Sequence, residues 1–143
     1  MIQKFQIREF IFDQDYEPVL RLWQNIESGM QVGRSDSSEE IKRKVERDPD
    51  LFLLAEVEGT IIGTVIGGFD GRRGMVYHLA VAQKHRRQGV AAALLAEVEK
   101  RLQAKGCVKV YLLVLEDNTS AIRLYEECGW KHQKQDLIFS KEF

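Results

Sequence analysis

The sequence predicts an α/β fold in which one mixed sheet of six to seven strands is flanked by about four helices. Between residues 51 and 81 the apolar residues run almost continuously, which is typical of strands covered on both faces. After Gly89 the apolar positions repeat with a helical period instead. Strand-like and helix-like segments follow one another without an internal repeat or linker, so we expect a single domain spanning residues 1–143.

The N-terminal part of the chain predicts one strand and two helices. Residues 2–9 alternate between apolar and polar side chains, as a half-buried strand does. Asp15 is a suitable N-cap for the first helix, with Pro18 in the first turn, where a missing N–H does little harm. Ser37 and Glu40 match a capping box, which predicts that a second, highly charged helix begins there.

The remaining elements follow from the two periods and from the turn residues between them. The expected strands cover residues 51–57, 60–68, 75–81 and 108–115, followed by two short terminal strands at 130–133 and 137–140. The expected helices run from Gly89 to Gly106 and over residues 118–128. This order places two strand-to-helix junctions in the second half of the chain, and both carry polar residues.

Composition and charge exclude several classes of protein. The 21 basic and 22 acidic residues give a net charge of −1, whereas a dedicated nucleic-acid binder usually has a strong basic excess. No apolar run approaches the roughly 20 residues that span a bilayer, and the N-terminus does not resemble a signal peptide. Cys107 and Cys128 form neither a CxxC pair nor a metal-binding cluster. We therefore expect a cytoplasmic protein with no nucleic-acid, membrane or metal partner.

The first polar junction lies between the strand at 75–81 and the helix that begins near Gly89. In Arg86-x-x-Gly89-x-Ala91, small residues leave the backbone N–H groups of a helix N-terminus accessible, and the helix dipole favours an anion there. Lys84, Arg86 and Arg87 add positive charge. The pattern is neither a Walker A loop nor a Rossmann turn. The alternative interpretation is a solvated basic turn whose glycine serves tight packing.

The second junction joins the strand at 108–115 to the following helix. Asn118 and Tyr125 are seven residues apart, about two helical turns, and therefore share a face of that helix. Two polar side chains on one face suit a ligand better than a core. The alternative is that Asn118 only caps the helix and that Tyr125 is half-buried packing.

Together, Arg86-x-x-Gly89-x-Ala91 and the Asn118, Ala121, Tyr125, Gly129-Trp130 run resemble the GNAT superfamily of N-acetyltransferases. The resemblance covers essentially the whole chain and implies that family's mixed, mostly antiparallel sheet. It also implies an enzyme that transfers the acetyl group of acetyl-CoA directly to a primary amine. The implied cofactor-binding residues are Leu79, Ala80, Val81, Arg86, Arg87, Gln88, Gly89, Val90, Ala91, Asn118 and Tyr125. The backbone N–H of Leu79 would hold the oxyanion, and Tyr125 would be the general acid.

The general base and the acceptor site are less clear in the sequence. Strand positions that carry the base in several relatives correspond here to Tyr77 and Met75, neither of which is a good base. Strand alternation predicts that the neighbouring His78 lies on the opposite face from Tyr77 and Leu79. We expect proton removal through ordered water anchored by Glu56, Tyr77 or Glu116. The alternative for Glu56 is an ordinary charge at a strand edge.

The resemblance places the acceptor among the first two helices, their loop and the terminal hairpin. This nominates Trp23, Met30 and Arg34, of which Arg34 could also be a solvated loop residue. The acceptor would be a small molecule, a peptide or a protein, and the resemblance also allows a homodimer. Two competing interpretations are a non-catalytic module that senses acyl-CoA or binds a protein, and a mononucleotide-binding α/β protein.

Overall fold

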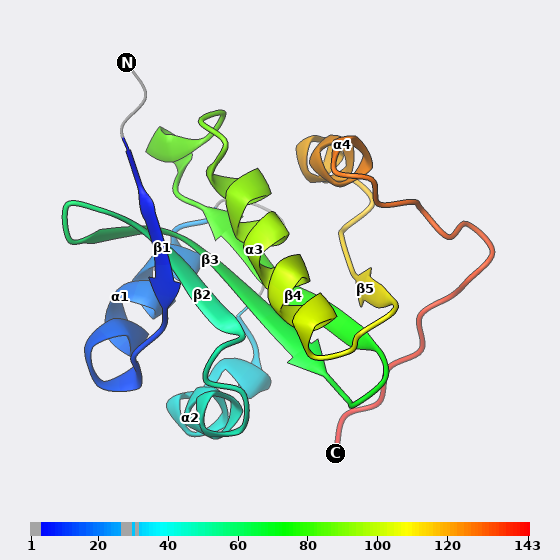
Figure 1. Cartoon of the computed structure of the whole chain (residues 1–143), viewed down its shortest axis with the longest axis horizontal. Coiled ribbons are helices and arrows are strands. Elements are labelled where there is room, and N and C mark those ends of the chain that lie inside the picture. The colour runs from blue at the N-terminus through cyan, green and yellow to red at the C-terminus, as the bar shows by residue number, and fades with distance from the viewer. Residues whose placement is uncertain (1–3, 27–29, 31) are drawn as a thin grey trace. The chain divides into compact units, whose positions relative to one another are not determined.

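The computed structural model describes residues 4–26, 30 and 32–143, and the chain divides after Leu113 into two compact units. The first unit contains a five-stranded sheet in the order β1-β2-β3-β4-β5, three α-helices and two short 3-10 helices. Its elements are β1 (Gln6–Glu9), α1 (Phe12–Gln24), η1 (Arg34–Asp36), α2 (Ser38–Arg47), β2 (Phe52–Val57), β3 (Thr60–Phe69), β4 (Gly74–Val81), η2 (Gln83–His85), α3 (Val90–Ala104) and β5 (Val110–Leu112). The second unit contains α4 (Thr119–Glu127) (Figure 1).

The predicted α/β class, the mixed sheet and the four α-helices are confirmed. The sheet has five strands instead of six to seven, because residues 130–133 and 137–140 do not form strands. In this described segment the backbone bonds are local, such as the turn bond from Asp136 N to Gln133 O, and Leu137 is 80% exposed. Of the predicted first strand, Gln6–Glu9 form β1 and residues 4 and 5 do not belong to a strand. Residues 2 and 3 of the prediction lie outside the described residues.

The two predicted helix starts have different outcomes. Ser37 caps α2, since its hydroxyl accepts the Glu40 N–H at 3.3 Å. The reciprocal half of the capping box is not formed, because the Ser37 N–H donates to the Arg34 carbonyl and the Glu40 carboxylate pairs with Arg43. The prediction for Asp15 is wrong: the N-cap of α1 lies four residues earlier, at Ile11. Asp15 instead lies inside the first turns and its carboxylate accepts the Ile11 N–H at 2.7 Å. A carboxylate near a helix N-terminus satisfies an otherwise unpaired backbone donor from either position.

The sheet is covered on both faces, as its apolar strands require. On one face, α3 packs against β3 so closely that a Cβ at Gly67 would lie 2.7 Å from Val98 Cγ2 (Figure 1). On the other face, α1 and α2 close over a buried cluster that includes Trp23, Phe52 and Ile66. The aromatic rings of Phe52 and Phe10 stack there with centroids 4.1 Å apart. Burial on both faces explains why the central strands contain few polar residues.

The strand β4 has two irregularities. Its register with β3 passes from the pair Ile66–Tyr77 to the pair Thr64–Ala80, so β4 contains one more residue than β3 over this interval. This bulge coincides with His78, whose φ of 49° lies in the left-handed region that non-glycine residues rarely adopt. On its other edge, β4 pairs in parallel with β5 only over Gly74–Val76. The strand segment from Tyr77 to Val81 therefore continues without a β5 partner.

Candidate active site

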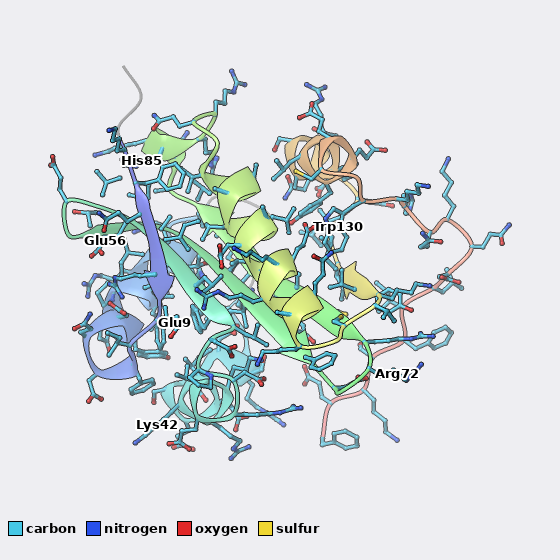
Figure 2. All side chains as sticks on the ribbon, in the orientation of Figure 1. Glu9, Lys42, Glu56, Arg72, His85 and Trp130 are labelled. Carbon is cyan, nitrogen blue, oxygen red and sulfur yellow. The ribbon has the colours of Figure 1, made fainter. Side chains whose placement is uncertain are left out.

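The unpaired edge of β4 leads directly into the basic turn. Ala82 N donates to Ile62 O at 2.8 Å, toward β3, so the backbone groups of the preceding Val81 point to the opposite edge. The Val81 carbonyl accepts a hydrogen bond from Arg86 Nε at 3.2 Å. This contact folds the turn back against the end of the strand. Figure 2 shows His85 on the same turn, between β4 and α3.

The N-terminus of α3 offers backbone donors to which no side chain of the described residues bonds. Gly89 is the N-cap with a φ of 82°, and it provides no side-chain hydrogen bond. The Ala93 N–H bonds to the Gly89 carbonyl, so the N–H groups of Val90, Ala91 and Ala92 precede the first intrahelical bond. A Cβ at Gly89 would meet nothing within 4 Å, which shows open space beside these donors. Such an end attracts a phosphate group, as the sequence predicts.

On the face of the sheet covered by α1 and α2, the bulge of β4 borders a pocket of about 690 Å³. His78 lines this pocket, and its Nε2 lies 2.8 Å from Asp36 Oδ1 on η1. Asp36 is buried, with 6% of its surface exposed. Its other carboxylate oxygen accepts the Gly33 N–H at 2.9 Å, and its carbonyl accepts the Tyr16 hydroxyl at 2.9 Å. The imidazole is thus hydrogen-bonded to a buried carboxylate whose residue is itself held by two further hydrogen bonds.

Hydrogen bonds also hold the backbone of the bulge. Trp23 Nε1 donates to Thr64 Oγ1 at 2.9 Å, and the Thr64 hydroxyl donates to the His78 carbonyl at 2.8 Å. The Trp23 and His78 rings are in contact, with centroids 4.6 Å apart. Residues on α1, β3 and η1 therefore fix both the backbone and the side chain of His78. A non-glycine residue with positive φ persists where its surroundings determine it in this way.

The prediction that His78 lies on the opposite face from Tyr77 is wrong. Both side chains line the same pocket. Strand alternation assumes one residue on each strand per pair, and the extra residue in β4 breaks this assumption at His78. The sequence contains no glycine or asparagine at this position to signal the left-handed conformation.

Burial and hydrogen bonds set the ionisation states of two residues in this pocket, Asp36 and Tyr77. Burial raises the pKa of Asp36, but the hydrogen bonds from His78 and from the Gly33 N–H outweigh it and hold that pKa below its usual value. Burial raises the pKa of the Tyr77 hydroxyl. At neutral pH, Asp36 is therefore a carboxylate that only accepts hydrogen bonds, and Tyr77 keeps its proton.

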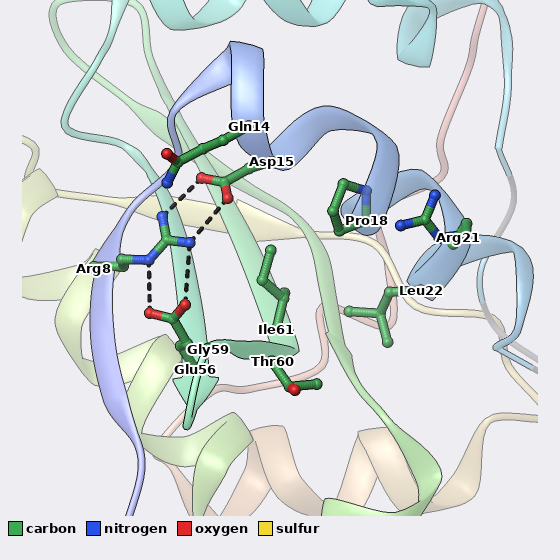
Figure 3. A pocket seen from close by; sticks show the side chains of 10 residues that line it. All are labelled: Arg8, Gln14, Asp15, Pro18, Arg21, Leu22, Glu56, Gly59, Thr60 and Ile61. Atoms are coloured by element: carbon green, nitrogen blue, oxygen red, sulfur yellow. Dashed lines mark hydrogen bonds and ion pairs between the residues drawn. The ribbon is translucent and has the colours of Figure 1, made fainter.

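Glu56, one of the predicted anchors for a catalytic water, lies at a second pocket of about 560 Å³ (Figure 3). Its carboxylate forms an ion pair with Arg8 Nε at 2.9 Å. The same guanidinium binds Asp15 through Nη1 at 2.7 Å and Nη2 at 2.9 Å. Arg8 thus bridges two carboxylates, from β2 and α1. The structure gives Glu56 a role as an ion-pair partner, and its role as a base stays a prediction.

The three residues predicted to bind the acceptor lie in different settings. Trp23 is 1% exposed and its ring packs against that of His78, and its role as a substrate contact stays a prediction. Met30 is half-buried and packs against the cluster under α1 and α2. Arg34 is exposed at the start of η1, two residues before Asp36. Sequence reasoning missed Asp36, because a single loop aspartate carries no signal without its partner across 42 residues.

In the second unit, Asn118 caps α4 by accepting the Ala121 N–H at 3.3 Å. Asn118 is therefore a helix cap, as one of the two interpretations of the sequence expects. Its binding of a ligand stays a prediction. Burial raises the pKa of the Tyr125 hydroxyl, so Tyr125 carries a proton at neutral pH. Within this unit the Tyr125 ring lies 6.2 Å from the Trp130 ring, and Trp130 N donates to the Tyr125 carbonyl at 2.9 Å. The predicted water anchor Glu116 is exposed.

Two further observations concern the described residues as a whole. Across residues 4–26, 30 and 32–143, no three His, Cys, Asp or Glu side chains gather in a way that could hold a metal ion. In the same part of the chain, no helix combines the length and apolar character needed to cross a bilayer.

Comparisons with known proteins define the class to which this fold and site belong. Residues 13–130 match the model of the acetyltransferase (GNAT) family, and the chain belongs to that family. It is a GNAT-superfamily N-acetyltransferase, as the sequence motifs predict. An acetyltransferase of Photorhabdus laumondii is 44% identical over 137 residues, which cover 95% of this chain and 94% of that protein. An acetyltransferase of Pectobacterium atrosepticum is 45% identical over 126 residues, or 88% of this chain and 87% of that one.

Solved structures show the same fold. The PaiA N-acetyltransferase of Thermoplasma acidophilum, in complex with coenzyme A, aligns with a TM-score of 0.79 at 20% identity, over 94% of each chain. Ard1 of Thermoplasma volcanium aligns with a TM-score of 0.76 at 27% identity, over 87% of this chain and 81% of that one. An aminoglycoside acetyltransferase, AAC(6')-Iy, aligns with a TM-score of 0.76 at 18% identity, over 99% of this chain and all of that one.

Proposed function

We propose that this protein uses acetyl-CoA and transfers its acetyl group directly to a primary amine of a small molecule, peptide or protein. One observation carries the proposal: the edge of β4 left unpaired beyond Val76 runs straight into the uncapped N-terminus of α3. An extended thioester arm needs unpaired backbone groups beside it, and a pyrophosphate needs converging N–H donors. The solved complex of a similar fold with coenzyme A supports the same cofactor.

In this proposal, the cofactor residues fall into two groups within the first unit. The backbone of Leu79, Ala80 and Val81 pairs with the pantetheine arm. The segment from Arg86 through Gln88 to Ala91 binds the pyrophosphate with N–H groups, and the exposed side chains of Arg86 and Arg87 add charge. Phosphate bonds to guanidinium groups are charge-assisted and therefore strong.

The chemistry proposed is a direct displacement at the thioester. The amine nitrogen forms a bond to the acetyl carbonyl carbon, and the oxyanion that develops is stabilised by the Leu79 backbone N–H. The carbon–sulfur bond then breaks, and Tyr125 gives its proton to the departing CoA thiolate. Tyr125 recovers a proton as the acetylated nitrogen loses one. Asn118 binds the pantetheine or the backbone next to it.

The cellular setting is also part of the proposal. We propose a cytoplasmic enzyme whose residues 1–143 act as one acetyltransferase domain, as a monomer or a homodimer. The sequence contains neither a CxxC pair nor a metal-binding cysteine cluster, which favours a reducing compartment. A near-neutral net charge gives no support for nucleic acid as a partner.

The experiment is a parallel thermal-shift titration with acetyl-CoA, CoA, ATP and NAD, followed by a thiol-release assay with an amine panel. A ligand at 100 times its Kd raises the apparent stability by about 2.7 kcal/mol, which such a titration resolves. We expect a shift with acetyl-CoA and CoA alone, and CoA release that requires an amine. Shifts with ATP or NAD instead would support a mononucleotide-binding protein. Acetyl-CoA binding without turnover on any amine would support a non-catalytic acyl-CoA module.

A further inference from the structure

We propose that the 690 Å³ pocket beside the β4 bulge is the acceptor site and that His78, held by Asp36, is the general base in it. The inference rests on the proposed acetyl transfer and names the group that removes the acceptor's proton. It replaces the expected water-mediated route with a side chain that lies at the pocket wall.

The hydrogen bond between His78 and Asp36 determines which imidazole nitrogen can act. Ionised Asp36 only accepts hydrogen bonds, so the hydrogen on this contact belongs to His78 Nε2. In the neutral imidazole the lone pair is then on Nδ1. Among the described residues nothing donates to or accepts from Nδ1, and 21% of the His78 side chain is exposed. This nitrogen is therefore available to a molecule in the pocket.

The bulge gives His78 this position. An ordinary strand residue at 78 would point to the face covered by α3, away from Tyr77. The extra residue brings both side chains to the same pocket, immediately before Leu79 in the chain. A base on this strand therefore lies within one residue of the backbone N–H proposed to hold the oxyanion. General bases act over hydrogen-bond distances, so such adjacency favours the assignment.

The charges of the pocket indicate the kind of amine. Three carboxylates face three cationic side chains, so the ionised lining is balanced apart from His78: Asp36, Glu40 and Asp70 against Lys44, Arg47 and Arg73. A polycation gains little from a balanced lining, because each attraction is offset by a repulsion. The remaining wall is largely apolar or aromatic and includes Ile66, Met75, Tyr77 and Tyr111. We infer a primary monoamine on an apolar or aromatic stem.

The proton balance of the step is simple. The acceptor enters as an ammonium ion and gives one proton to His78 Nδ1, which leaves a neutral amine to attack the thioester carbon. When the carbon–sulfur bond breaks, Tyr125 gives its proton to the thiolate. The acetylated nitrogen loses its second proton, and this proton replaces the one that Tyr125 gave. His78 then returns its proton to solvent. The products are the amide, CoA thiol and one released proton.

The test uses 2-phenylethylamine as the probe acceptor, with CoA release as the readout. Loss of a general base lowers rates by about 10² to 10⁴, so we expect a fall in kcat of this order for His78→Ala. The acetyl-CoA affinity should stay unchanged, because His78 is not among the cofactor residues. Gln103→Ala, a change at an exposed residue of α3 outside the proposed site, is the control and should keep wild-type turnover. Added imidazole should partly restore His78→Ala, which opens space beside the pocket.

Three outcomes would overturn the inference. The first is a kcat of His78→Ala close to that of the wild type. The second is that imidazole restores neither His78→Ala nor, where that variant does not fold, His78→Gly. The third is that spermidine is acetylated and 2-phenylethylamine is not, which excludes the inferred acceptor class. If the wild type does not bind acetyl-CoA at all, the proposed function fails, and this result is distinct from each of the three.

Asp36 is a positioning residue in this scheme, and its effect appears in the pH profile. Groups that face His78 in the pocket or lie behind it are Asp36, Tyr77, Tyr16, Glu40, Lys44, Arg47, Asp70, Arg73 and Tyr111. Asp36→Asn keeps the size of the side chain and removes its charge. We expect a lower kcat and an acid limb of the kcat/KM profile displaced from its wild-type position, with acetyl-CoA affinity unchanged. An unaltered limb would mean that Asp36 is only structural.

Discussion

His78 Nε2 and Asp36 Oδ1 lie 2.8 Å apart, although the two residues are 42 positions apart in the chain. The contact joins the bulge in β4 to the short helix η1 between α1 and α2. It links a conformation that a histidine rarely adopts to a carboxylate that is almost fully buried. The pocket wall thus depends on a hydrogen bond that no local sequence pattern reveals.

This pair makes stability depend on acidity. Because the folded-state pKa of Asp36 is below its unfolded value, the stabilisation is fully present above the unfolded pKa and is lost as pH falls through the folded pKa. Asp36→Asn should lower the free energy of unfolding by about 1–3 kcal/mol at neutral pH, the usual range for a disrupted buried polar contact. The difference from the wild type should shrink as the pH is lowered below 4, measured by urea unfolding. A difference that does not change with pH would contradict the argument.

The basic turn should control cofactor affinity through charge. Arg86→Glu combined with Arg87→Glu should weaken CoA binding at low salt by at least about tenfold, because charge-assisted phosphate contacts become repulsions. Isothermal titration at rising ionic strength should show this loss diminish as salt screens the charges. Lys42→Glu (Figure 2) combined with Arg43→Glu, at two exposed positions of α2, makes the same change in net charge and is the control. An unchanged CoA affinity in the double variant would contradict the assignment of the turn.

Gly89 should be required for the shape of the anion site. Gly89→Ala places a side chain at a φ of 82°, which costs on the order of 1 kcal/mol. The methyl group itself has free space within 4 Å, so the fold should survive with a small decrease in Tm. It would, however, stand beside the donors at the start of α3. We expect the free energy of CoA binding to weaken by more than the free energy of unfolding. Gly59→Ala, at a similar φ of 81°, serves as the control for backbone strain alone.

Tyr125 should act on turnover and not on folding. Tyr125→Phe removes the hydroxyl and keeps the ring that lies 6.2 Å from Trp130. Loss of a general acid lowers kcat by about 10² to 10⁴, while acetyl-CoA binding in a thermal-shift titration should persist. Since burial raises the pKa of Tyr125, the wild type should keep this acid through neutral pH and lose activity only on the alkaline side. Turnover equal to the wild type would remove Tyr125 from the mechanism.

Much of the first unit could be predicted from local sequence. The N-cap at Ser37, the apolar runs of β2 and β3, and the start of α3 after Gly89 depend on neighbouring residues, and the structure confirms each. The terminal segments at 130–133 and 137–140 were predicted wrongly because short alternating runs become strands only when another strand pairs with them. The same reason explains why β5 is limited to Val110–Leu112, the part that β4 can pair with.

The sequence by itself determined the family, the fold class and the glycine at the start of α3, because these depend on glycine, charge and apolar period within a short stretch of chain. Only the tertiary structure decided where His78 points and which carboxylate holds it. The direction of a strand side chain depends on the pairing register, and one extra residue opposite β3 changes that register. That pairing, and the contact with Asp36, form between segments distant in the chain, so the candidate base emerged only from the folded molecule.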